Sequence, residues 1–182
     1  MKRPRQFVLL SMVLFALSAY AGEEQAAPAT PEGMNNARIG ALLEKLNLQA
    51  VGGDGKWRLV LNDREMIIIT NESANRMRIF TPVVGADELT EAILLRVMQA
   101  NFDSALDARY AIAKGALWST FIHPLRALDD EEFLQGLGQV YNLANTFGSS
   151  YSSGLLLFEG GDSSGIQEKE LIDDLVEKGL AI

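Results

Sequence analysis

Apolar and polar side chains alternate along much of the segment 57–81, which is the period-two pattern of strands that bury one face. Trp57, Leu59 and Leu61 set the pattern, and a β-branched run follows at 66–70. Turn-forming residues between these runs make the links short, which is typical of hairpins. The sequence therefore predicts an antiparallel meander with strands at 57–61, 66–70 and 77–81.

Two segments around this meander repeat their apolar residues with helical spacing. The first covers 35–47, and the glycine-rich stretch 52–55 ends it. The second covers 87–101, with Asp87 and Glu88 placed beside its positive N-terminal end.

A further strand pair and a long helix complete the pattern. Apolar residues at 109–114 and 117–124 predict two more strands. Asp129 is the predicted N-cap of a helix that runs to about Phe147, and Glu132 stands three residues later, as in a capping box. The order is helix, three strands, helix, two strands, helix, which predicts an α+β fold with an antiparallel sheet of about five strands.

The helix at 87–101 has apolar residues on more than one stripe, so one face against a sheet does not account for them. Either the helix is enclosed within the domain, or its second face meets another subunit. A one-sheet domain of this size has few layers to bury both faces, which favours the subunit contact. The predicted homodimer interface consists of Leu89, Ile93, Leu94, Val97 and Met98.

The N-terminus has the three parts of a secretory signal peptide. Basic residues at positions 2, 3 and 5 precede a mostly apolar run at 7–17, and Ser18-Ala19-Tyr20-Ala21 supplies an Ala-x-Ala site. The apolar run is well short of the roughly 20 residues that a membrane-spanning helix needs. We expect cleavage after Ala21 and a periplasmic or secreted product with no stable membrane insertion; retention of 1–21 as an anchor is the alternative.

Composition divides the rest of the chain. Residues 22–33 lack large apolar side chains, which predicts a flexible linker before a domain at 34–148. The segment 149–182 is rich in glycine and serine, with a brief apolar run at 155–158 and an acidic helix at 167–178. We expect this tail to fold back on the domain, because four consecutive apolar residues rarely stay exposed; a docking segment is the alternative.

The 182-residue chain is acidic, with a formal net charge of −8. The signal segment holds three of the sixteen basic residues and no acidic ones, so the remaining thirteen basic and twenty-four acidic residues give −11. This charge disfavours binding to nucleic acid or anionic lipid; it favours solubility, and a basic partner is the alternative. The chain has no cysteine, which excludes disulfides, a thiolate nucleophile and cysteine-based zinc sites.

Three features could be taken for catalytic or metal sites. Gly161-Asp162-Ser163-Ser164-Gly165 fits the nucleophile-elbow pattern, but no histidine follows it, so we interpret it as a flexible turn. His123, the only histidine, is interpreted as a structural residue at a strand end. The carboxylates at 129–132 are explained by the helix dipole. We therefore predict no catalytic site, no metal and no cofactor.

Four large aromatic side chains fall on alternating strand positions. Core packing is their default interpretation. The alternative is an apolar sheet face or edge that accepts a partner segment. The candidate partner-binding residues are Trp57, Phe80, Trp118 and Phe121.

The order of elements, read with its residues, resembles the type III secretion chaperone fold, the Tir-chaperone family and the related YbjN-like proteins. The similar part spans roughly 34–147. It includes GDGKWRLVLND, RMRIFTPV followed by ELTEAILLRVMQANF, and the stretch HPLRALDDEEFLQGLGQVYNLA. These are patterns of hydrophobicity and capping. The resemblance implies a small homodimer that binds segments of a partner protein without ATP or a cofactor.

Members of that family act in the cytosol, whereas this chain begins with an export signal. We therefore expect a non-enzymatic, exported protein-binding module with a secretion-chaperone-like fold. The alternatives are an envelope hydrolase that uses His123 and nearby carboxylates, and a structural subunit of an envelope complex.

Overall fold

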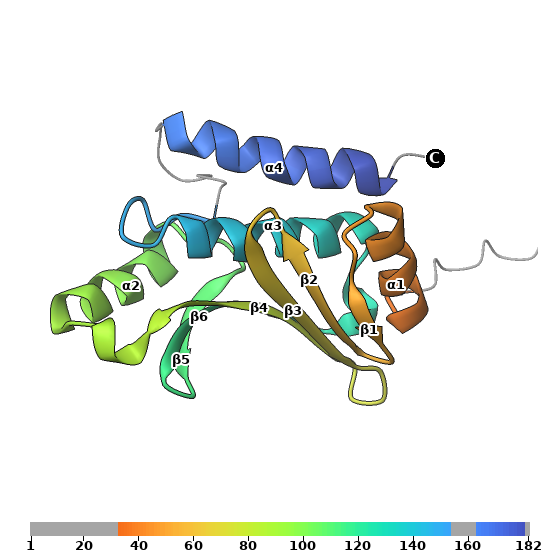
Figure 1. Ribbon diagram of the computed structural model, residues 1–182, viewed down its shortest axis with the longest axis horizontal. Coiled ribbons are helices and arrows are strands. Elements are labelled where there is room, and N and C mark those ends of the chain that lie inside the picture. The colour runs from red at the N-terminus through yellow and green to blue at the C-terminus, as the bar shows by residue number, and fades with distance from the viewer. Residues whose placement is uncertain (1–32, 154–162, 181–182) are drawn as a thin grey trace, which may run out of the picture. The chain divides into compact units, whose positions relative to one another are not determined.

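A computed structural model describes residues 33–153 and 163–180 (Figure 1). Both ranges belong to one structural unit, 31–182. The predicted signal peptide, nearly all of the predicted linker and the apolar run at 155–158 lie outside the described residues.

The described residues form four α-helices, six strands and two 3₁₀ turns. In chain order they are α1 (Asn36–Lys45), β1 (Val51–Gly53), β2 (Lys56–Leu61), β3 (Arg64–Asn71), β4 (Arg76–Gly85), η1 (Ala86–Glu88), α2 (Glu91–Asp103), β5 (Arg109–Ala113), β6 (Ala116–His123), η2 (Leu125–Ala127), α3 (Asp130–Asn145) and α4 (Ser163–Leu180).

All strands join one antiparallel sheet in the order β1-β2-β3-β4-β6-β5, which confirms the predicted α+β class and meander. The glycine-rich stretch after α1 is more than a break, because Val51–Gly53 pairs with β2 as a short edge strand. The β5–β6 link is the residue pair Lys114 and Gly115, with φ values of 51° and 74°. Positive φ at both positions is what a tight two-residue hairpin requires.

The alternation predicted for the meander places its apolar residues against the helices. Leu59, Ile68 and Ile79 are buried and belong to one core with residues of α1 and α3. Side chains at the intervening positions lie on the opposite side of the sheet, because successive residues of a strand point to opposite faces.

Helix α3 is enclosed on two sides, between the sheet and α4 (Figure 1). A Cβ on Gly136 would lie 2.8 Å from the ring of Phe121 on β6, and one on Gly138 would lie 2.7 Å from Ile172 on α4. These two glycines let α3 approach both layers closely. Ile172 and Leu175 are buried, so the tail helix packs on the domain, as expected.

The starts of three helices test predictions made from the sequence: one prediction is confirmed and two are wrong. The capping box of α3 is confirmed, with Asp129 accepting from the Glu132 N–H at 2.8 Å and Glu132 accepting from the Asp129 N–H at 3.1 Å. Asp87 and Glu88 do not begin α2, because the chain is extended at the residue after η1 and Thr90 caps the helix. Ser163 opens α4, so this part of the predicted turn is helical.

No described helix combines the length and the apolar character that crossing a membrane requires.

Candidate functional site

The sheet surface that faces away from α3 is built by five neighbouring strands, β2, β3, β4, β6 and β5, and no described helix covers it. We call it the outer face. The strand register aligns its side chains in rows across the sheet. One row is Lys56, Ile69, Arg78 and Ile122; the next is Arg58, Ile67, Phe80, Thr120 and Arg109; a third includes Pro82, Trp118 and Ala111.

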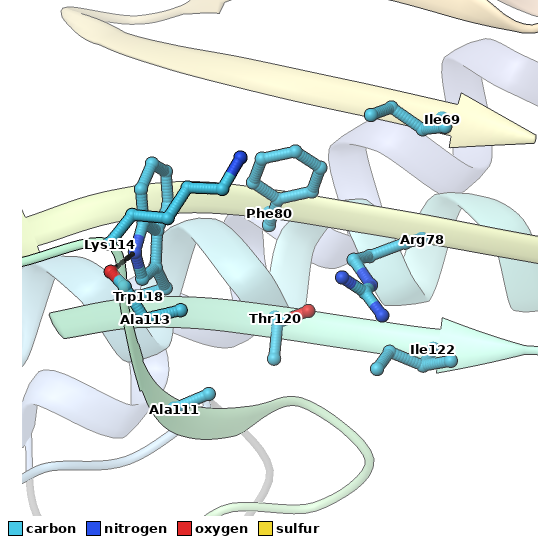
Figure 2. Close-up of a pocket in the computed structure, with 9 residues that line it drawn as sticks. All are labelled: Ile69, Arg78, Phe80, Ala111, Ala113, Lys114, Trp118, Thr120 and Ile122. Carbon is cyan, nitrogen blue, oxygen red and sulfur yellow. Dashed lines mark hydrogen bonds between the residues drawn. The ribbon is translucent and has the colours of Figure 1, made fainter. Parts of the chain in front are cut away.

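A pocket of about 370 Å³ is hollowed into the outer face (Figure 2). Phe80 and Trp118 are its aromatic members, with ring centroids 5.5 Å apart and ring planes at 69°. The Trp118 Nε1–H donates to the backbone oxygen of Ala113 at 2.8 Å, which fixes the indole. Edge-to-face contact and this hydrogen bond hold both rings in place before any ligand arrives.

Isoleucines extend the apolar surface beyond the aromatic pair. Ile69 and Ile122 also line the pocket, and Ile122 is 54% exposed. Scattered exposed apolar residues are ordinary on a protein surface, but a contiguous group around a hollow marks an interaction site. Arg78 and Lys114 complete the lining with positive charge.

The structure divides the four predicted partner-binding residues between the two sides of the sheet. Phe80 and Trp118 lie in the outer pocket. Trp57 and Phe121 are each 5% exposed and belong to the core, which was their default interpretation. The sequence analysis did not include Ile69 and Ile122, although alternation places them on the same face of the sheet as Phe80 and Trp118.

A second exposed apolar surface lies on α2. Val97 is 3% exposed and belongs to the core, and Leu89 and Ile93 pack against that core. Among the predicted interface residues Met98 is prominently exposed, and Leu95 and Phe102 join it at helical spacing. We call these three residues the α2 stripe. Phe102, 91% exposed, lies just beyond the predicted helix end, which is why it was missed.

The free edge of the sheet at β5 is partly closed by α2. The Asn101 side chain accepts from the Tyr110 N–H at 2.7 Å and donates to the Tyr110 C=O at 3.1 Å. It therefore occupies the backbone groups that an added strand would pair with at this position. This closure makes the outer face, rather than the β5 edge, the more accessible surface for a partner segment.

A hollow of about 180 Å³ lies beside His123, where the enzyme alternative expects a pocket. It is smaller than the roughly 300 Å³ at which ordinary ligand pockets begin. Its two carboxylates also have structural partners: Glu132 caps α3, and Asp107 accepts from Gln139 at 3.2 Å. The His123 ring stacks on Phe121, and its Nδ1 lies 3.0 Å from the Pro124 oxygen. Among the described residues, no group of three or more His, Asp or Glu could hold a metal ion.

Comparison with protein-family models gives no match, and comparison with curated proteins gives none either. Solved structures do match. The HopA1–SchA chaperone–effector complex aligns with a TM-score of 0.50 and 11% identity, covering 62% of this chain and 94% of that chain. This likeness is one of fold: the chain has a type III secretion chaperone-like fold.

Two further structures align over similar lengths. The ExsC–ExsE complex gives a TM-score of 0.49 and 17% identity, covering 61% of this chain and 91% of that chain. The Yersinia pestis type III secretion chaperone SycH, in complex with a stable fragment of YscM2, gives a TM-score of 0.49 and 15% identity. This alignment covers 62% of this chain and 98% of that chain.

Proposed function

We propose that this protein is a non-enzymatic, exported binding module whose outer face holds a segment of a partner protein. The observation that carries the proposal is the preorganised Phe80–Trp118 pair in an apolar hollow that no described part of the chain fills. The fold supports it, since HopA1–SchA is a chaperone in complex with an effector protein. Tryptophan and other aromatic side chains in such pockets commonly supply most of an interface's binding energy.

The first test is capture of the partner by the full chain, tagged at its C-terminus and purified from the compartment where it accumulates. Extract from the cell envelope is passed over the wild-type protein and over Trp118→Ala, and retained proteins are identified by mass spectrometry. We expect a stoichiometric partner that the wild type retains and Trp118→Ala loses. A partner retained equally by both would overturn the assignment to the outer face.

We further propose that the protein is a homodimer joined through the α2 stripe. Exposed apolar side chains at 95, 98 and 102 share one helix face, which is the arrangement that two antiparallel copies bury together. Met98→Glu with Phe102→Glu is expected to convert a dimer to a monomer in sedimentation analysis. Val51→Glu combined with Val60→Glu is the matched control, because it also adds two carboxylates at exposed apolar residues, both outside the stripe. An unchanged mass for the variant with glutamates at positions 98 and 102 would contradict the interface.

Export is the third element of the proposal. Expression of the full chain should give periplasmic or secreted protein whose N-terminal residue is Gly22, as N-terminal sequencing would show. Protein that begins at Met1 and stays with the membrane fraction would instead support an uncleaved anchor.

A further inference from the structure

The outer face is positively charged, although the chain as a whole is acidic. Its register places Lys56, Arg58, Arg76, Arg78 and Arg109 at outward strand positions, and Lys114 at the pocket rim. The single acidic residue at an outward strand position is Glu65. The outward strand positions thus carry five basic residues and one carboxylate, and Lys114 adds a sixth basic group at the pocket rim.

Most of this positive charge has no carboxylate partner among the described residues. Within the part of the chain that the structure describes, the ion pair on the outer face is Arg58 with Glu65, at 3.5 Å between Nη1 and Oε1. Arg78 and Lys114, which line the pocket, make no ion pair with another described residue. An acidic protein that keeps its carboxylates off one apolar surface leaves that surface complementary to negative charge.

The basic and apolar groups are interleaved rather than separated. Along one row Ile69 and Ile122 lie on either side of Arg78, and neighbouring strands are about 4.8 Å apart. Figure 2 shows Lys114 and Arg78 on either side of Phe80. If a ligand places an apolar group in the hollow, the polar groups that flank it therefore lie near Arg78 on one side and Lys114 on the other.

One residue that lines the same hollow has an unsatisfied hydroxyl group. The Thr120 Oγ1 atom is buried and has no hydrogen-bond partner among the described residues, and Thr120 lines the pocket. A buried hydroxyl without a partner costs free energy, which rotation of the Thr120 side chain toward an acceptor on a bound ligand would recover. A carboxylate or carbonyl oxygen is such an acceptor.

We propose that the outer face selects an acidic segment of its partner, in which apolar side chains enter the pocket and flanking carboxylates meet Arg78 and Lys114. This inference rests on the proposed function and specifies the chemistry of the partner. A long polyanion such as nucleic acid fits less well, because the acidic remainder of the chain repels it while a short segment meets only the basic face.

The test uses three fluorescein-labelled peptides of equal length with the same leucine and phenylalanine positions. Their intervening residues are all Glu, all Gln or all Lys. By fluorescence anisotropy with the full chain, we expect the Glu peptide to bind at least tenfold more tightly than the Gln peptide, and the Lys peptide most weakly. The Glu preference should shrink as salt is raised, because exposed charges are screened.

Arg78→Glu should lower affinity for the Glu peptide at least tenfold and raise that for the Lys peptide. Lys45→Glu is the matched control, because it makes the same change in net charge on the exposed side of α1. Equal loss in both variants would assign the effect to net charge and overturn the inference.

Other outcomes separate this inference from the proposed function. If the three peptides bind equally and all are lost in Trp118→Ala, the face binds protein without charge selection, and only the inference fails. Tighter binding of a single-stranded oligonucleotide or of anionic vesicles than of the Glu peptide also overturns it. If no peptide binds, the captured partner decides: its loss in Arg78→Glu supports the inference, and its retention there contradicts it. If neither peptides nor any partner bind, both proposals fail.

Discussion

The two faces of the sheet use the same kinds of residue for different purposes. On the inner face, Phe121 is covered by α3, whose Gly136 lets the helix backbone approach the ring. On the outer face, Phe80 and Trp118 contact each other in a hollow that no described helix covers. An aromatic side chain on a strand thus signals a large apolar surface, and the elements packed over it decide whether that surface stabilises the fold or stays available to a partner.

Charge separates the faces as clearly as burial does. The buried residues of the inner face are uncharged and mostly apolar, with Thr81 and Ser119 as buried polar members, whereas the outer face interleaves isoleucine with arginine and lysine. Buried charges need partners and carry a large desolvation cost, which keeps them out of the core. On the outer face they remain solvated until a partner of opposite charge covers them.

Truncating one aromatic residue on each face should show the largest contrast. We expect Phe121→Ala to lower the free energy of unfolding by about 3–5 kcal/mol, because it leaves a cavity beneath α3. Phe80→Ala should cost only about 1 kcal/mol, since part of its surface is already exposed. Urea denaturation of both variants measures the difference, and equal losses would contradict the division between core and binding surface.

The reverse contrast should appear in binding. Trp118→Ala should weaken partner or peptide binding by about 2 kcal/mol or more, roughly thirtyfold, as is typical of a tryptophan at an interface centre. Its circular dichroism spectrum should stay that of the wild type. A Trp118→Phe variant keeps an aromatic ring in the hollow but loses the hydrogen bond to Ala113. Its binding affinity should lie between those of the wild type and Trp118→Ala.

Gly136→Ala tests how tightly the inner face is sealed. The added methyl group would lie 2.8 Å from the Phe121 ring, so we expect a loss of about 1–3 kcal/mol from overpacking. Gly40→Ala in α1 is the control, because nothing lies within 4 Å of its added Cβ. There the better helix propensity of alanine should stabilise the protein by about 0.5–1 kcal/mol. Thermal unfolding would show whether each change raises or lowers the stability of the protein. Stabilisation by both changes would mean that α3 is not closely packed on the sheet.

The smallest effect concerns a feature that belongs to neither face. Asp129→Ala removes the N-cap of α3 and should cost about 1 kcal/mol, while Asp129→Asn should restore most of it. Binding to the outer face should not change in either variant. A larger loss of binding than of stability would link the cap to the partner site, against the present division.

Local patterns were sufficient for most of the fold. Alternation placed the three strands of the meander, and the spacing of Asp129 and Glu132 placed the start of α3 within one residue. The start of α2 was placed too early, because Asp87 and Glu88 suit a helix start by charge alone, and the extended residue between η1 and α2 leaves no sequence signal as strong. The short strand β1 was missed because glycine is read as a break unless a neighbouring strand pairs with it.

The candidate site was predicted only in part, because it depends on which face of the sheet the helices cover. Phe80 and Trp118 were named together with Trp57 and Phe121, although alternation puts Trp57 on the same side of its strand as Leu59 and Leu61, and Phe80 on the same side as Arg76 and Arg78. Ile69 and Ile122 were absent from the candidates, although they complete the same pocket. The α2 stripe shows the same limit: periodicity identified an apolar excess, but not which residues would face outward.

The sequence by itself determined most of the elements, their order and the α+β class, because strand alternation, helical spacing, turns and caps are local consequences of side-chain chemistry. Only the tertiary structure decided that α3 and α4 stack on one side of the sheet and that basic residues from separate strands converge on the other. The net charge of the chain averages over all of its surfaces, so it concealed a positive face. Register and packing bring distant residues onto one surface, and neither can be read from the positions of those residues along the chain.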